Sequence, residues 1–229
     1  MPSSPSRRRV WLSGSLAAAT FITVTVIGLL IVGSSSWSAT EVQVVVWVHG
    51  VQSVVGDVLA LTINSVFGPG GAVLVVLIAL AWILLATRSW RATLRTSIVL
   101  GVPWACAEVL KAIVQRPRPN PELLQPMIVA DPVTFSYPSG HTAFAAALCC
   151  ALLLVVLPRR MWRWGVPVAV LVVLVTAWSR VYLGVHYPTD VLASAVLVPA
   201  LALATARATA AWSFLTPPPA DAAVVKPVS

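Results

Sequence analysis

Long apolar runs are the feature that most constrains how this 229-residue chain can fold. A membrane-spanning helix needs about 20 apolar residues, and fewer where its ends are buried in protein. Residues 10–32 and 70–87 qualify directly, and residues 92–113 have a helical pattern although they include charged residues and a proline. Three shorter runs need neighbouring polar residues to complete a span: 141–157, 165–178 and 191–206. We therefore predict an all-α, polytopic membrane protein with six transmembrane helices.

The composition supports this class, because 59% of the residues are hydrophobic and only 10% are charged. A net charge of +8 would suit a nucleic acid or an acidic surface, but the distribution of the charge argues otherwise. With a cytoplasmic N-terminus and six spans, eleven of the fifteen basic residues fall on the cytoplasmic side, as the positive-inside rule expects. The remaining four are Lys111, Arg116, Arg118 and Arg180. We expect membrane lipids as neighbours and no nucleic-acid partner.

Three short polar clusters interrupt the apolar chain. The first has the pattern Lys-x6-Arg-Pro and runs from Lys111 to Arg118 and Pro119. The second is Pro-Ser-Gly-His at residues 138–141, and the third is Ser-Arg-x5-His-x3-Asp at residues 179–190. Charged groups close to a membrane span are costly, so they indicate function. Cations, two histidines and one carboxylate are the groups that the binding and cleavage of a phosphate require.

The three patterns, in this order, resemble the signature motifs of the type 2 phosphatidic acid phosphatase (PAP2) superfamily, in its membrane lipid phosphatase branch. Every defining position matches, and the flanking apolar segments extend the similarity over most of the chain. Pro-Ser-Gly-His alone would be weak evidence, whereas the ordered triple is specific. The resemblance implies a PAP2-type bundle of six helices that acts on a lipid phosphate.

Five residues are the candidates for binding the phosphate. Lys111, Arg118 and Arg180 would hold its negative charge, the arginines with bidentate forks and the lysine as a point charge. Ser139 and Gly140 lie where a loop opens the fourth predicted span, so free backbone N–H groups and the helix dipole would favour an anion there.

His186, Asp190 and His141 are the candidate catalytic residues. If His186 stands at the entrance of a helix, Asp190 can accept its second ring N–H and fix the tautomer. The free ring nitrogen could then attack phosphorus and form a phosphohistidine. The spacing alone does not distinguish the two histidines. The resemblance implies that His186 is the nucleophile and that His141 protonates the leaving oxygen and then activates water.

The same residues bear on several other functions. We expect no metal and no cofactor, because the site has one carboxylate and several cations that would repel a divalent ion. A transporter of a phosphorylated amphiphile is the alternative from a different class, but it does not explain the Ser-Gly-His turn. A lipid-linked phosphotransferase remains open, whereas the six spans disfavour a soluble haloperoxidase.

Some polar residues lie outside these patterns. Arg116 occupies no motif position, and a contact to lipid headgroups is one interpretation of it. Glu108 precedes Lys111 by one helical turn, which favours a structural ion pair. His49 lacks motif neighbours, so we interpret it as structural or solvated. We expect Cys106, Cys149 and Cys150 to be small packing residues.

The organisation along the chain follows from these assignments. We predict a cytoplasmic N-terminus at 1–9, a six-helix domain at 10–212 and a disordered cytoplasmic tail at 213–229. Residues 34–67 are less apolar, and we expect an outer loop and an interfacial helix there. The first apolar run is long for a removable signal, so we expect it to be retained.

The predicted protein is a metal-independent, multi-pass lipid phosphatase of the bacterial plasma membrane, with its active site facing outside. Its expected substrate is an undecaprenyl or other isoprenyl diphosphate, phosphatidate or phosphatidylglycerol phosphate. The motifs recognise a phosphate, and nothing in the sequence identifies the lipid tail.

Overall fold

The computed structural model describes residues 6–130, 133–212 and 214–215, and these residues contain helices and no strand. The prediction of an all-α fold is therefore confirmed. Short 3₁₀ turns occur at Pro121–Leu123 and Arg159–Met161, and a π-helical segment, Leu152–Val156, continues α6. The α-helices are α1 (Arg7–Val32), α2 (Ser35–His49), α3 (Val54–Phe67), α4 (Pro69–Thr87), α5 (Trp90–Val114), α6 (Gly140–Ala151), α7 (Trp162–Tyr182) and α8 (Pro188–Ala210).

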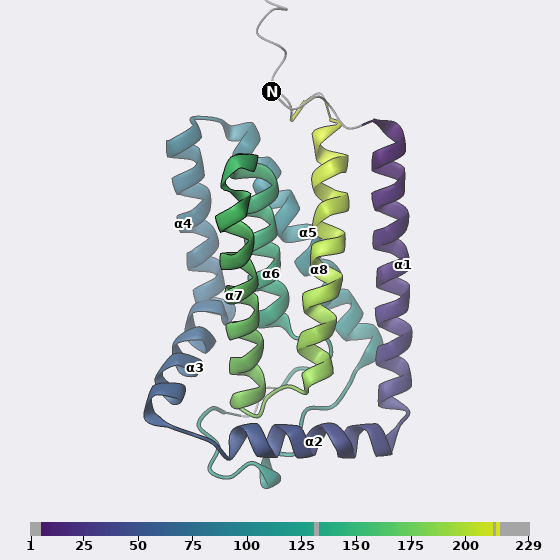
Figure 1. Ribbon diagram of the computed structural model, residues 1–229, viewed down its shortest axis with the longest axis vertical. Helices are drawn as coiled ribbons and strands as arrows, with labels where there is room; N and C mark the ends of the chain where they lie inside the picture. Colours follow the sequence, from purple (N-terminus) through teal and green to yellow (C-terminus); the bar gives the residue numbers. More distant parts are fainter. Residues whose placement is uncertain (1–5, 131–132, 213, 216–229) are drawn as a thin grey trace, which may run out of the picture.

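Six of these helices, α1 and α4 to α8, run roughly parallel along the long axis of the molecule (Figure 1). In the described part of the chain, α1, α4, α5, α7 and α8 are long and apolar enough to cross a membrane, and α6 is a shorter apolar helix. The three shorter apolar runs were predicted to need neighbouring polar residues to complete a helix, and polar motif residues do extend these helices. Helix α6 begins at Gly140, α7 extends to Tyr182, and α8 begins at Pro188.

Helix α6 forms the centre of the bundle and packs against α5, α7 and α8. Its buried face is built largely from small side chains, including Ala143, Ala146, Ala147 and Ala151. Small residues allow helix backbones to approach closely, which is the main source of packing between helices in a membrane. The same helix presents its N-terminus, with Gly140 and His141, to the end of the bundle where the polar clusters gather.

The segment 34–67 differs from its prediction, since the expected outer loop is replaced by helix. Helices α2 and α3 fill nearly all of it and meet at a bend of 117°. Helix α2 lies across one end of the bundle, and α3 leads back to the start of α4 (Figure 1). The polar residues that suggested a loop instead make tertiary contacts: Glu41 with Arg116, Asp57 with Tyr182, and Asn64 with Arg180.

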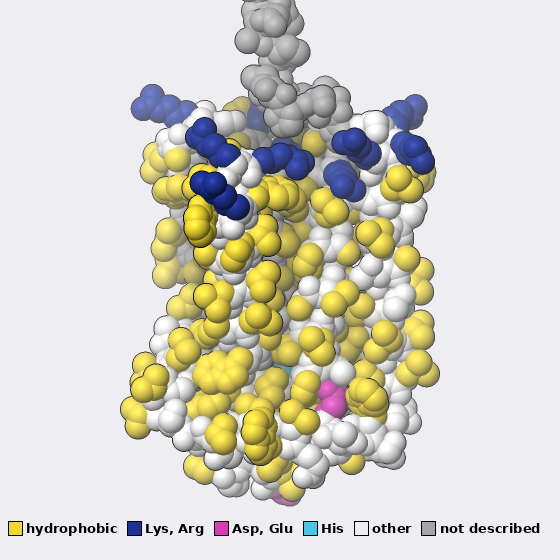
Figure 2. Space-filling view, in the orientation of Figure 1, with side chains coloured by type: hydrophobic (Ala, Val, Ile, Leu, Met, Phe, Trp, Pro, Cys, Tyr) yellow, Lys and Arg dark blue, Asp and Glu magenta, His cyan; other side chains and the backbone are white. Residues whose placement is uncertain are grey.

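Basic side chains gather at one end of the bundle, opposite α2 (Figure 2). They come from the start of α1, the α4–α5 connection, the segment before α7 and the end of α8. The described members of this basic end are Arg7, Arg8, Arg9, Arg88, Arg91, Arg95, Arg159, Arg160, Arg163 and Arg207. The predicted tail, apart from residues 214 and 215, lies outside the described residues, as does Lys226.

Candidate active site

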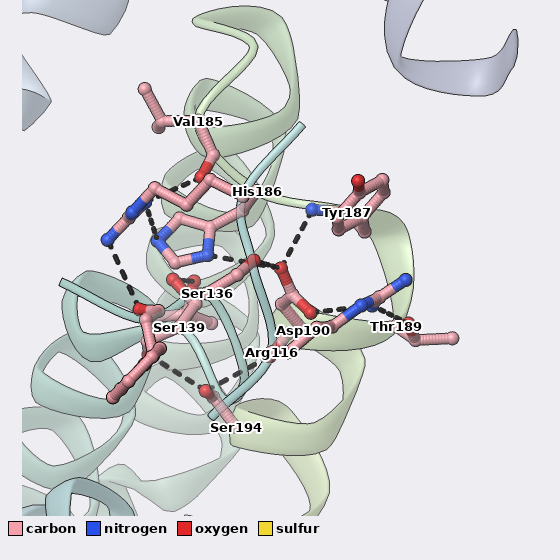
Figure 3. Close-up of polar contacts among 12 residues, drawn as sticks. Arg116, Ser136, Ser139, Val185, His186, Tyr187, Thr189, Asp190 and Ser194 are labelled. Carbon is pink, nitrogen blue, oxygen red and sulfur yellow. Dashed lines mark hydrogen bonds and ion pairs between the residues drawn. The ribbon is translucent and has the colours of Figure 1, made fainter. Parts of the chain in front are cut away.

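The three polar clusters meet at the end of the bundle opposite the basic end. The first follows α5, the second leads into α6, and the third joins α7 to α8. The backbone N–H of Ser139 donates to the carbonyl of Asp190 at 3.0 Å, and the Ser194 hydroxyl donates to the carbonyl of Ser139 at 2.8 Å. These bonds join the second cluster to the third, although about 50 residues separate them in the chain (Figure 3).

Two local features shape this junction. Gly184 has φ of 73°, a left-handed conformation that favours glycine, and it turns the chain from the end of α7 towards His186. Tyr137 anchors the second cluster, because its hydroxyl donates to the carbonyl of Val24 in α1 at 2.8 Å. A Cβ atom at Gly28 would lie 2.6 Å from the Tyr137 ring, so α1 can approach this side chain only with a glycine there.

His186 and Asp190 form a buried pair. Nδ1 of His186 lies 3.3 Å from Oδ2 of Asp190, and the two residues are 2% and 0% exposed. The same Oδ2 atom accepts from the Ser136 hydroxyl and, at 2.8 Å, from the backbone N–H of Tyr187. Burial lowers the pKa of His186 from 6.5 to about 4, although the hydrogen bond to Asp190 acts in the opposite direction. The imidazole is therefore held in its neutral form.

Arg118 defines which nitrogen of His186 carries the proton. Its Nη1 atom lies 3.2 Å from Nε2 of His186, and a guanidinium can only donate, so Nε2 is the acceptor. The ring proton is then on Nδ1, facing Asp190. Arg118 is held by the carbonyl of Thr134 at 2.7 Å and the carbonyl of Val185 at 2.5 Å. An unprotonated ring nitrogen thus stands beside a cation.

Arg180 and His141 are connected through Asn64 of α3. The Asn64 side-chain oxygen accepts from Nη1 of Arg180 at 2.8 Å, while its backbone carbonyl lies 3.3 Å from Nε2 of His141. Arg180 is 1% exposed, and its Nε also donates to the Ser179 hydroxyl at 3.2 Å. Arg180, His186 and Arg118 lie close enough to His141 to interact with it electrostatically.

Lys111 lies at the edge of the site. Its Nζ atom bonds both carboxylate oxygens of Glu108, at 3.0 and 3.1 Å, which confirms the predicted ion pair. A Cβ atom at Gly140 would lie 3.1 Å from this Nζ and 2.9 Å from Glu108. The lysine therefore stands directly beside the N-terminus of α6.

Comparison with known proteins gives the family. The family model for the PAP2 superfamily matches residues 92–214, which is more than half of the chain and includes all three polar clusters. The chain belongs to the PAP2 superfamily. The solved structure of a transmembrane PAP2-type phosphatidylglycerolphosphate phosphatase from Bacillus subtilis has the same fold, with a TM-score of 0.67 at 21% identity. That match covers 81% of this chain and 92% of the other.

Three relatives of this PAP2 protein are similar in part of their sequence. An undecaprenyl-diphosphatase of Sulfolobus acidocaldarius is 40% identical over 124 residues, which are 52% of this chain and 55% of the relative. A decaprenylphosphoryl-5-phosphoribose phosphatase of Mycolicibacterium smegmatis is 39% identical over 88 residues, 38% of this chain and 43% of the relative. A lipid A 4'-phosphatase of Bacteroides thetaiotaomicron is 34% identical over 134 residues, with shares of 52% and 56%. The chain spans about half the length of these relatives.

Three residues that contact the candidate site were not among the residues predicted from the sequence. Asn64 and Glu41 precede the segment that matches the family, and neither stands in a motif. Arg116 was interpreted as a contact to lipid headgroups, which is wrong, because it is 1% exposed and forms ion pairs with Glu41 and Asp190. The sequence did hold one indication that Arg116 belongs near the site: it lies on the predicted outer side, two residues before Arg118.

Other assignments in this PAP2 protein are confirmed. His49 is structural, since it is buried with its ring nitrogens 2.9 Å from the Tyr182 carbonyl and 3.2 Å from the Pro126 carbonyl. The three cysteines are free and partly buried within α5 and α6.

Proposed function

We propose that this PAP2 protein hydrolyses the phosphate monoester or diphosphate of a membrane lipid through a phosphohistidine at His186. The observation that carries the proposal is the state of the His186 ring. Nδ1 faces the carboxylate of Asp190 at 3.3 Å, and Nε2 accepts from Arg118 at 3.2 Å. The nitrogen lone pair that would attack phosphorus is therefore unprotonated and points at Arg118, which we assign to the phosphate.

The two half-reactions follow from this arrangement. In the first, Nε2 of His186 forms a bond to phosphorus while the bond to the leaving oxygen breaks, and His141 donates the proton that this oxygen takes up. In the second, His141 accepts a proton from water, whose oxygen attacks phosphorus and breaks the N–P bond. Asp190 stabilises the charged imidazole in both steps, as the carboxylate of a catalytic triad does.

Cations and backbone donors would stabilise the transition state. We assign the phosphate oxygens to Lys111, Arg118 and Arg180, together with the N–H groups of Ser139 and Gly140 at the start of α6. These groups supply the charge that Mg²⁺ supplies in other phosphoryl-transfer sites. We therefore propose a metal-independent phosphatase without a cofactor.

A lipid substrate is supported by the surroundings of Arg180. A groove of about 370 Å³ between α3 and α7 is lined by four apolar residues: Leu59, Leu174, Val175 and Trp178. The carbonyl of Ala60, next to this lining, accepts from Nη2 of Arg180 at 3.5 Å. We propose that the lipid tail lies against this apolar surface. The names of the relatives favour isoprenyl diphosphates among the candidate lipids, with phosphatidate and phosphatidylglycerol phosphate as the others.

The face of the membrane follows from the charges. The basic end of the bundle would lie in the cytoplasm under the positive-inside rule, which puts the site at the extracytoplasmic face. This orientation suits a bacterial plasma membrane protein that processes lipid carriers on the outer surface.

The proposal is tested by phosphate release from purified protein in detergent. Undecaprenyl diphosphate, phosphatidate and phosphatidylglycerol phosphate are each assayed with the wild type and with His186→Ala. We expect inorganic phosphate from at least one lipid with the wild type, and none with the variant. Transfer of phosphate to an added acceptor lipid without release would favour a phosphotransferase. Uptake of an intact lipid phosphate into liposomes, again without release, would favour a transporter.

A further inference from the structure

Arg116 stands outside the signature motifs, yet it is one of the most buried large side chains, at 1% exposure. Its guanidinium lies between two carboxylates. Nη1 donates to Oδ1 of Asp190 at 2.7 Å, and Nη2 donates to Oε2 of Glu41 at 2.7 Å (Figure 3 shows the contact with Asp190). Burying an arginine is costly unless its charge is paired and its N–H groups are bonded. The two carboxylates meet this requirement, and they fix the place of the guanidinium.

Further contacts orient the guanidinium. Nη1 also donates to the Thr189 hydroxyl at 2.8 Å, and the guanidinium carbon lies 3.9 Å from the centre of the Tyr187 ring. Glu41 in turn accepts from the backbone N–H and the hydroxyl of Thr189, both at 2.8 Å. The carboxylate of α2 thus holds both Arg116 and the first turn of α8, which carries Asp190.

The contact with Arg116 has a direct consequence for Asp190. Among the described residues, Oδ1 accepts from Arg116 alone, while Oδ2 accepts from Ser136, Tyr187 and His186. Bonds at both oxygens fix the plane of the carboxylate, so Oδ2 stays directed at the imidazole. A buried carboxylate without a cation tends to take up a proton, which would weaken its hold on the ring.

We propose that Arg116, anchored by Glu41, is a positioning residue that keeps Asp190 ionised and directed at Nδ1 of His186. This inference rests on the proposed role of His186 as the nucleophile. Arg116 itself is enclosed by Asp190, Glu41, Thr189 and Tyr187, so in this proposal it makes no contact with the substrate. Its loss should therefore slow the chemistry and leave substrate binding nearly unchanged.

The first test separates kcat from KM. We expect Arg116→Gln to lower kcat by about 10- to 100-fold, the range for groups that orient a functional residue, with little change in KM. Arg116→Lys should recover part of the loss, because it keeps the charge but cannot bond both carboxylates as a planar fork does. A rise in KM at constant kcat would instead mean that Arg116 binds the substrate, and it would overturn the proposal.

A matched control is available at the opposite end of the bundle. Arg95 is partly buried, whereas Arg116 is fully buried, and Arg95 donates to the Ala206 carbonyl at 3.0 Å and the Thr209 hydroxyl at 3.3 Å. Arg95→Gln should leave kcat unchanged. An equal loss of kcat in both variants would show a general effect of removing a buried arginine, and that result would also contradict the proposal.

A double-mutant cycle tests whether Arg116 acts through Asp190. On the Asp190→Asn background, Arg116→Gln should lower kcat by less than about threefold, because the carboxylate that it positions is already gone. If the two losses multiply in full, Arg116 acts independently of Asp190 and the proposed role is wrong.

The last test needs no turnover, so it separates this proposal from the proposed function. Nitrogen NMR of histidine-labelled protein in detergent reports the tautomer of His186, which is assigned by comparison with His186→Ala. We expect the wild type and Arg95→Gln to show one tautomer, with the proton on Nδ1. Arg116→Gln, and to a smaller extent Glu41→Gln, should show a mixture.

The outcomes of the two kinds of test are distinct. An unchanged His186 tautomer in both the Arg116 and the Glu41 variant would overturn the positioning role, whatever the activity. A wild type with the expected tautomer but no phosphate release would refute the proposed function alone. If Arg116→Gln does not fold, Glu41→Gln still tests the proposal, since it keeps the arginine in place and removes the charge of its outer partner.

Discussion

Nη1 of Arg118 lies 3.2 Å from Nε2 of His186, so a guanidinium stands in front of the ring nitrogen that we propose as the nucleophile. Other N–H groups of Arg118 donate to the carbonyl and the hydroxyl of Thr134, at 2.7 and 3.0 Å. An arriving phosphate can replace the contact with the imidazole while these bonds keep Arg118 in place. In the proposed mechanism, the cation that binds the phosphate would therefore also bring phosphorus to His186.

Substitution of the two histidines should have different effects on the phosphoenzyme. His186→Ala removes the nucleophile, so no phosphoenzyme should form with any substrate. His141→Ala keeps the nucleophile but slows both proton transfers. With a substrate whose leaving group needs little protonation, it should accumulate an acid-labile phosphohistidine.

The measurement is the mass and acid lability of quenched protein after brief incubation with an activated phosphate ester. The doubly substituted variant, with alanine at both positions, is the control for non-enzymatic labelling. A phosphoenzyme on His186→Ala would assign the nucleophile to a different residue.

Activity should be complete in excess EDTA, because Lys111, Arg118 and Arg180 would neutralise the phosphate. Arg180→Lys should nevertheless lower kcat/KM by about 10-fold or more, the loss of one hydrogen bond to a charged group, since an ammonium cannot replace the planar fork. Steady-state phosphate release with and without the chelator checks both statements. Activity that disappears with EDTA and returns with Mg²⁺ would show that the three cations do not replace a metal ion at the site.

The orientation in the membrane can be tested by labelling in intact cells. A cysteine at the exposed Glu122, on the side of the site, should react with an impermeant thiol reagent, and one at the exposed Arg160, at the basic end, should not. Cys106, Cys149 and Cys150 are first replaced by alanine, and labelling after lysis controls for accessibility. Labelling at Arg160 alone in intact cells would reverse the proposed topology.

The acid limb of the pH profile should lie well below the ordinary pKa of histidine. His186 must be neutral to attack phosphorus, and burial lowers its pKa from 6.5 to about 4. Activity should therefore persist at pH 5 to 6 and fall as the pH drops through about 4, where the imidazole becomes protonated. The rate of phosphoenzyme formation is measured with two esters whose phosphate groups titrate differently. A limb near 6.5 with both esters would contradict the buried, neutral imidazole.

The helices were predictable where they depend on the residues of one continuous segment. Each of the six predicted runs is helical in the structure, because apolar segments in lipid must satisfy their backbone groups internally. The segment 34–67 was harder to predict, since Glu41, Asp57 and Asn64 lower its hydrophobicity as loop residues would. In the structure their polar groups bond to Arg116, Tyr182 and Arg180, so helices α2 and α3 need no solvent at these positions.

The sequence by itself determined the helical membrane fold and the family, and it predicted eight residues of the candidate site, because hydrophobic runs and motif spacing can be read along the chain. Only the tertiary structure decided which of these groups meet and which residues outside the motifs support them. Glu41 and Arg116 are 75 residues apart, and Asn64 and Arg180 are 116 apart. Ion pairs form between groups that are close in space, and a lipid-like sequence gives no signal of which distant polar residues the packing of its helices brings together.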